Sequence, residues 1–251
     1  MEPYKIGEIF VLLPGIPART NRGHLGYCSI SIVPFNDDGW ILFDTGCFGD
    51  RELLLSRLNS IGVSPEDVRY TVLSHSHYDH CLNLPVFENS TVVISRAERE
   101  YVREVQSGSR IDYSVPECFD ELLQEHEVVQ FQSSHRLNDD LTLFETPGHT
   151  PGGISLLREG DQNMVICGDA VKNAYEFVYE NQHSVYETLK TARDSIRKIK
   201  DKGDLFIPGH DRPFARASGG GIRFVGDPLR WEVRGDLYPG GQDISITALS
   251  R

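Results

Sequence analysis

The sequence has no long apolar run and no excess of basic residues. No stretch approaches the ~18 apolar residues of a membrane-spanning helix, and the amino terminus has no basic region followed by an apolar stretch and a cleavage site. These absences predict a soluble, cytoplasmic protein without a membrane partner. The net charge of −12 comes from 37 acidic and 25 basic residues, and it disfavours nucleic acid, which is bound by clustered Lys and Arg. We therefore expect a small-molecule substrate.

Cysteine is scarce and scattered. The sequence has five cysteines and no CxxC pair, and the five are Cys28, Cys47, Cys81, Cys118 and Cys167. An odd, dispersed set is not typical of a disulfide framework. We expect free thiols in a reducing compartment.

Internal repeats and low-complexity linkers are also missing, so we expect residues 1–251 to form a single domain around one sizeable core. Short β-rich runs such as "EIFVLLP", "GWILFDTG", "LTLFETPG" and "NMVICGD" recur in both halves of the chain. Residues 216–251 are expected to form a short glycine-rich β extension. The oligomeric state is left open.

Apolar spacing predicts helices over about residues 50–62, 95–106 and 184–202. The second helix begins with a capping-box pattern, Ser95 and Glu98, and the third with another, Ser184 and Glu187. Two β-rich halves with helices at intervals predict two sheets packed face to face with helices outside.

One short stretch is unusually rich in metal-binding side chains. The sequence "HSHYDH" places His75, His77, Asp79 and His80 within six positions, directly after an apolar run. Buried imidazoles and carboxylates at this density need partners, and nitrogen and oxygen donors suit zinc, iron or manganese.

Three more candidate ligands follow later apolar strands, each directly after a glycine. They are His149 in "TPGHT", Asp169 in "VICGDA" and His210 in "FIPGHD". With the first cluster they make seven donors, which exceeds one tetrahedral site but fits two ions that share a bridging carboxylate. We therefore expect two divalent transition-metal ions, zinc before iron or manganese.

These motifs, together with "FDTG" from Phe43 to Gly46, resemble the metallo-β-lactamase superfamily in identity and order. The resemblance implies an α+β fold, the four-layer αββα sandwich. It implies that one ion is held by His75, His77 and His149 and the other by Asp79, His80 and His210. It also implies that Asp169 bridges the ions and that Asp44 orients a ligand histidine.

Paired metal ions point to hydrolysis, because bridging water becomes hydroxide near neutral pH and the ions polarise a carbonyl. We expect an ester or lactone as the substrate, and Asp79 is expected to steer a proton to the leaving group. Tyr175, six residues beyond Asp169, is a second candidate catalytic residue. The alternative is that Tyr175 has a purely structural role.

The family resemblance is greatest to the stand-alone N-acyl homoserine lactonases, which match in length and around the first motif. The sequence departs from them at Lys172, where they usually have tyrosine, and at Gly153, where they usually have histidine. Two alternatives stay open. One is a thioester hydrolase, and the other is a persulfide dioxygenase with a single iron on His75, His149 and Asp169.

Overall fold

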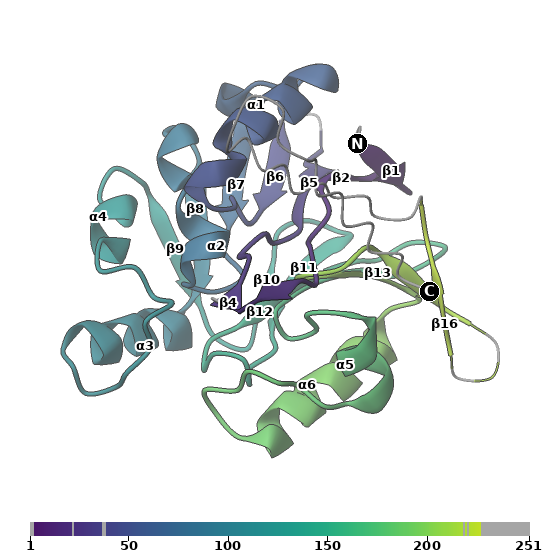
Figure 1. The fold of residues 1–251 in the computed structure, drawn as a ribbon. Helices are drawn as coiled ribbons and strands as arrows, with labels where there is room; N and C mark the ends of the chain where they lie inside the picture. The colour runs from purple at the N-terminus through teal and green to yellow at the C-terminus, as the bar shows by residue number, and fades with distance from the viewer. Residues whose placement is uncertain (1–2, 22, 37–38, 218, 220, 227–251) are drawn as a thin grey trace, which may run out of the picture.

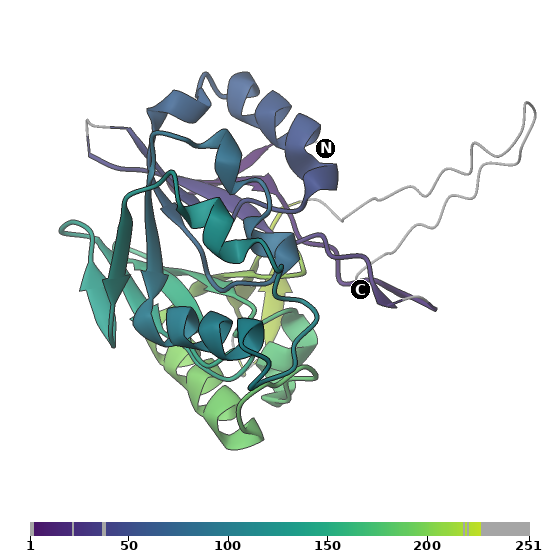
Figure 2. The same cartoon turned by 90° about the vertical axis from the view of Figure 1, so that its left-hand side faces the viewer.

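The computed structural model of the chain describes residues 3–21, 23–36, 39–217, 219 and 221–226. Within these residues two mixed β-sheets pack face to face, and helices cover the outer face of each sheet (Figure 1). The view in Figure 2 shows the blue helix α1 on one side of the stacked sheets and the green helix α6 on the other. This order of helices, sheet, sheet and helices is the predicted αββα sandwich.

The first sheet contains antiparallel strands followed by parallel ones. Its order is β1 (Tyr4–Ile6), β2 (Ile9–Leu13), β5 (Ile30–Pro34), β6 (Trp40–Phe43), β7 (Val68–Val72), β8 (Thr91–Ser95) and β9 (Val128–Phe131). Strands β6, β7, β8 and β9 pair in parallel. A small separate hairpin joins β3 (Arg19–Thr20) to β4 (Gly23–His24).

The second sheet is antiparallel except for one central parallel pair, β13 and β14. Its order is β10 (Ser134–Arg136), β11 (Leu141–Glu145), β12 (Ile154–Arg158), β13 (Met164–Gly168), β14 (Leu205–Pro208), β15 (Phe214–Arg216) and β16 (Ile222–Phe224). The glycine-rich extension expected over residues 216–251 begins as the β15–β16 hairpin. Residues 227–251 of that extension lie outside the described residues.

Helices form the connections between the parallel strands. They are α1 (Arg51–Ser60), α2 (Tyr78–Cys81), α3 (Arg96–Gln106), α4 (Phe119–Leu123), α5 (Ala174–Tyr179) and α6 (Leu189–Lys202). Three short 3₁₀ turns are also described: η1 (Phe48–Asp50), η2 (Pro65–Asp67) and η3 (Leu84–Val86). Parallel pairing needs such crossovers, because a parallel strand cannot be reached by a two-residue turn.

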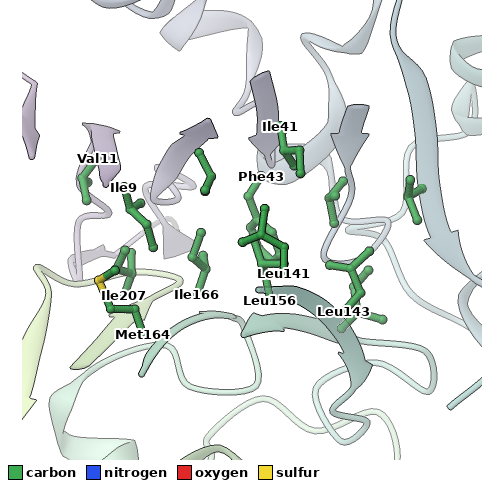
Figure 3. Close-up of a cluster of buried hydrophobic side chains, with 14 of the residues drawn as sticks. Ile9, Val11, Ile41, Phe43, Leu141, Leu143, Leu156, Met164, Ile166 and Ile207 are labelled. Atoms are coloured by element: carbon green, nitrogen blue, oxygen red, sulfur yellow. The ribbon is translucent and has the colours of Figure 1, made fainter. Parts of the chain in front are cut away.

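Apolar side chains fill each interface between the layers. Figure 3 shows Ile9 and Phe43 of the first sheet pointing toward Met164 and Leu156 of the second, and all four are buried. Separate buried clusters join the first sheet to α1, the same sheet to α3 and α4, and the second sheet to α5 and α6. Burial of each large apolar side chain contributes about 1.5–3 kcal/mol, so these interfaces hold the four layers together.

The predicted helices are found, with one wrong boundary. Helices α1 and α3 lie within the ranges expected for them, but the third helix begins at Leu189 and not at Ser184. Its cap is Thr188, whose hydroxyl accepts a hydrogen bond from the Thr191 amide. The backbone of Ser184 and Tyr186 instead forms hydrogen bonds with the loop that carries His149. Helix α5 lies between β13 and α6, and the apolar spacing did not indicate it.

The cysteines of the described structure are all free, as the sequence predicts. Cys28, Cys81 and Cys167 are buried, whereas Cys118 is exposed. Among the described residues, no helix combines the length and the apolar character required to cross a bilayer.

Candidate metal centre

The seven predicted donor side chains meet where strands of both sheets end. His75 and His77 follow β7, and Asp79 and His80 lie on the short helix α2. His149 follows β11, Asp169 follows β13 and His210 follows β14. Parallel strands end at the same edge of a sheet, so the pairs β6–β7 and β13–β14 bring their following loops together. All seven side chains are buried.

Glycines before the donors allow the backbone to pass close to its neighbours. Gly148 has a φ of 142°, and a Cβ atom at this position would overlap Ala192 of α6. Gly209 packs so tightly against Asp169 that an added Cβ would contact its carboxylate. The small residues therefore fix the positions of His149 and Asp169.

Each of the five histidines in this cluster has one ring nitrogen that contacts a partner outside the cluster. The outer contacts are His75 Nδ1 to Ser74 Oγ (2.9 Å), His77 Nε2 to Asp112 Oδ2 (2.8 Å), His80 Nδ1 to Asp44 Oδ2 (2.8 Å), His149 Nδ1 to the Ser184 carbonyl (2.8 Å) and His210 Nδ1 to the Tyr27 carbonyl (3.1 Å). The other nitrogen of each ring is then directed toward the other donors. Such outer contacts orient metal-ligating histidines and select their tautomers.

The carboxylate of Asp169 lies between two sets of histidines. Its Oδ2 is 3.9 Å from His75 Nε2 and 3.3 Å from His149 Nε2. Its Oδ1 is 3.4 Å from His80 Nε2 and 3.3 Å from His210 Nε2. The two oxygens of one side chain therefore face different histidine pairs.

The donor atoms form groups that are close enough to share an ion. His75, His77 and His149 form one such group, and Asp79, His80 and His210 form another. His77 Nδ1 and His149 Nε2 lie 3.0 Å apart. His75, His80 and Asp169 also lie within ligand distance of one another, which places the two groups side by side.

Unsatisfied polar atoms at the centre of the cluster test whether metal fits there. In the described structure His75 Nε2, His80 Nε2 and Asp169 Oδ1 are buried without a hydrogen-bond partner. Leaving such an atom unpaired costs about 1–3 kcal/mol, and here three of them point to the same place. Nitrogen and oxygen lone pairs in this arrangement fit divalent transition-metal ions.

Burial and neighbouring charges set the protonation of this cluster. Burial lowers the pKa of His75 and of His149 well below the usual value, so both imidazoles are neutral. Burial would raise the pKa of Asp169, but the positive charge of Lys172, together with the neighbouring histidines, outweighs burial and lowers the pKa well below its usual range. A neutral imidazole and an ionised carboxylate are the forms that bind metal.

Asp44 connects the first motif to the histidine cluster. Its Oδ1 accepts a hydrogen bond from the Ser74 amide at 2.7 Å, and its Oδ2 accepts one from His80 Nδ1 at 2.8 Å. Its backbone has a φ of 61°, in the left-handed region. A strained backbone at a buried aspartate is typical of functional sites, and the contact with His80 joins Asp44 to the cluster.

Two buried carboxylates beside the cluster were missed by the sequence analysis. Glu98 accepts hydrogen bonds from the amide and hydroxyl of Ser76, from the Thr150 hydroxyl and from the Gly152 amide. Asp112 contacts His77 from the loop between α3 and α4. In the sequence, Glu98 showed only the pattern of a helix cap, and Asp112 lies in no motif. The contacts of both carboxylates with the cluster join residues that are distant in sequence, so local patterns could not predict them.

A cavity of about 170 Å³ opens onto the donors and is walled by Tyr78, Ser114, Lys172 and Tyr186. Lys172 Nζ forms an ion pair with Asp169 Oδ2. Tyr175 is not brought into this cavity. Its side chain is 52% exposed, and its ring stacks on His183 with the ring centroids 5.7 Å apart.

Fold and donors together define an αββα protein with His and Asp groups that could hold metal ions. Residues 25–210 match the model of the metallo-beta-lactamase superfamily, and the chain belongs to this superfamily, whose members are mostly hydrolases.

Relatives and solved structures agree with this assignment. The metallo-beta-lactamase domain-containing protein 1 of Xenopus laevis is 28% identical over 213 residues, which cover 82% of this chain and 81% of that protein. An N-acyl homoserine lactonase of a Bacillus species is 27% identical over 168 residues, which cover 64% of this chain and 63% of that protein. The structure of AidC, a dizinc quorum-quenching lactonase, superposes with a TM-score of 0.62 at 19% identity and covers 80% of each chain, a likeness of fold alone.

Proposed function

We propose that this protein is a metal-dependent hydrolase that opens an ester or lactone with the help of two divalent transition-metal ions, expected to be zinc. The observation that carries the proposal is the position of Asp169, whose two carboxylate oxygens face different histidine pairs. A single ion would leave one of these sets without a partner.

The residues would divide between the two ions as their groups suggest. His75, His77 and His149 would hold one ion, Asp79, His80 and His210 would hold the other, and Asp169 would bridge them. Bound there, the ions would supply hydroxide near neutral pH and polarise the substrate carbonyl. Asp44 would hold the His80 ring in place through its 2.8 Å contact.

Asp79 would handle a proton at the reacting bond. Its carboxylate lines the cavity and lies 3.4 Å from His210 Nε2. Burial acts to raise its pKa, but the charges of His80 and His210 outweigh burial and lower it. An ionised carboxylate at this position can accept a proton and pass it to the leaving alkoxide.

The cavity dimensions favour a small reacting group. About 170 Å³ lies over the donors, and an adjoining space of about 90 Å³ shares Lys172, Ser184 and His210 with it. This volume suits a lactone ring or a small ester, with the rest of the substrate directed outward. The lactonase relative supports the same class of substrate.

Elemental analysis of the purified full chain, combined with a substrate panel, tests the proposal. We expect close to two transition-metal ions per chain. We also expect hydrolysis within a panel of acyl homoserine lactones, simple lactones and aryl esters, lost with a chelator and restored by zinc, manganese or cobalt. Asp169→Ala should lose metal and activity together. The matched control is Asp161→Ala, which removes an exposed carboxylate on the loop before β13, the strand that Asp169 follows. This variant should retain metal and activity.

Specific outcomes would contradict the proposal. One ion per chain, or unchanged metal content and activity in His80→Ala, would remove the dinuclear arrangement. Glutathione thioesters and glutathione persulfide complete the panel. Oxygen uptake with the persulfide and no hydrolysis would assign the protein to the single-iron alternative, and thioester cleavage alone would assign it to the thioester hydrolases.

A further inference from the structure

The loop between α3 and α4, residues 107–118, contacts three walls of the candidate site although no motif includes it. Asp112 contacts His77, the Ser114 carbonyl accepts a hydrogen bond from the Tyr78 amide, and Arg110 donates to the Tyr186 carbonyl. The neighbours of Asp112 point the other way, since Ile111 is 71% exposed and Tyr113 is 95% exposed. The buried Asp112 side chain is therefore directed into the protein from an otherwise exposed turn.

Both oxygens of Asp112 are occupied by donors. Oδ2 lies 2.8 Å from His77 Nε2 and accepts a hydrogen bond of 2.6 Å from the Tyr101 hydroxyl, and Oδ1 accepts one of 2.9 Å from the Ser114 amide. The Asp112 carboxylate therefore serves as the acceptor for all three donors.

His77 differs from the other four histidines of the donor cluster, because a different ring nitrogen makes its outer contact. Those four use Nδ1 for the outer contact, whereas His77 uses Nε2 and leaves Nδ1 for the centre. A neutral imidazole has one N–H and one lone pair. A carboxylate at Nε2 requires the proton there, so the lone pair of His77 must be on Nδ1.

We infer that Asp112 is a positioning residue that fixes the tautomer and ring orientation of His77, so that Nδ1 faces a bound metal ion. This inference rests on the proposed metal site of His75, His77 and His149. The Tyr101 hydroxyl holds the Asp112 carboxylate in turn, and neither residue lines the cavity over the donors.

An amide cannot replace this carboxylate, because three donors converge on it. If the amide oxygen of an Asp112→Asn side chain faced His77 and Tyr101, its NH₂ would face the Ser114 amide, donor against donor. In the reverse orientation the NH₂ would donate to His77 Nε2, which moves the proton to Nδ1 and removes the inward lone pair. Either arrangement weakens metal binding, and loss of an outer partner of this kind costs about 10–100-fold in metal affinity.

The test compares Asp112→Asn with Tyr101→Phe in the full chain. Zinc affinity is measured by chelator competition, and ¹⁵N NMR of the metal-free protein shows which His77 nitrogen carries the proton. We expect the wild type to carry it on Nε2, and we expect Asp112→Asn to bind zinc about 10–100-fold more weakly with the proton on Nδ1. Tyr101→Phe keeps the carboxylate, so it should lower thermal stability while changing zinc affinity less than about threefold, well below that loss.

The two readouts separate this inference from the proposed function. A wild-type His77 protonated on Nδ1 overturns the inference, whatever the variants do, and so does an Asp112→Asn protein that binds zinc as tightly as the wild type. An equal loss of affinity in both variants would also overturn it, because that result indicates general loosening of the loop. A wild type that binds no zinc but is protonated on Nε2 would refute the metal site and leave the tautomer assignment standing.

Discussion

Glu98 gives the most direct test of how this site is built, because it joins two ligand loops. Ser76 stands between His75 and His77, and Thr150 follows His149. Oε1 of Glu98 accepts from the amide and hydroxyl of Ser76 at 2.8 and 2.7 Å. Oε2 accepts from the Thr150 hydroxyl at 2.7 Å and the Gly152 amide at 3.1 Å. The side chain is fully buried, so water does not replace it in the folded protein.

The expected losses follow from counting donors. In Glu98→Gln the new NH₂ must face one pair of donors. A hydroxyl in that pair can turn and accept, but the backbone amide cannot. One unsatisfied buried amide costs about 1–3 kcal/mol, so we expect the free energy of unfolding to fall by about 2 kcal/mol. Glu98→Ala leaves both backbone amides and both hydroxyls unpaired and adds a cavity, so we expect a loss of about 4 kcal/mol or more.

Thermal unfolding of the metal-free protein measures these losses. In a chain of this size each kcal/mol shifts Tm by about 2–4 °C, so Glu98→Gln should lower Tm by about 4–8 °C and Glu98→Ala by more. The matched control is Glu100→Gln, which changes an exposed glutamate of the same helix and should stay within about 0.5 kcal/mol. A Glu98→Gln protein as stable as that control would refute the role assigned to the carboxylate.

Two further predictions concern the thiols and Tyr175. Burial raises the pKa of Cys28, Cys81 and Cys167, so at pH 8 the native protein should label rapidly at the exposed Cys118 and slowly at those three. Burial, assisted by Asp50, raises the pKa of Cys47 to about 11, and its labelling rate should climb about tenfold per pH unit below that value. Denaturation without reductant should release five thiols, and fewer would indicate a disulfide. Tyr175→Phe should leave kcat/KM within about twofold, because its half-exposed ring lies on His183 and not in the cavity. A tenfold loss would restore Tyr175 as a catalytic residue.

The sequence predicted those parts of the fold that depend on local patterns. Alternating and continuous apolar runs gave the central strands, and spacing gave α1 and α3. The start of α6 was wrong, because a good local capping pattern at Ser184 lost to tertiary contacts. The Ser184 carbonyl accepts from His149 Nδ1, and the Tyr186 amide bonds to the carbonyls of Gly148 and His149. Helix propensity of a few tenths of a kcal/mol per residue cannot outweigh these hydrogen bonds.

Residue types and their order along the chain indicated a metal-binding αββα protein. Short-range motifs such as "HSHYDH" and the glycine before each later donor are properties of the sequence, since they follow from which side chains bind metal and which residue permits a tight turn. The resemblance of these motifs to the metallo-β-lactamase superfamily extended the prediction of metal ligands to the whole donor set, and it added Asp44 as the residue that orients a ligand histidine.

Only the tertiary structure decided what surrounds those donors. Glu98 has the sequence signature of a capping residue, and Ser95 does accept from its amide at 3.0 Å, yet its carboxylate turns to Ser76, Thr150 and Gly152. Asp112 is 35 residues from His77 in sequence, and no periodicity relates them. A buried carboxylate finds its partners through the packing of distant segments, because in the interior every polar group must be paired with whatever donors the fold brings within reach.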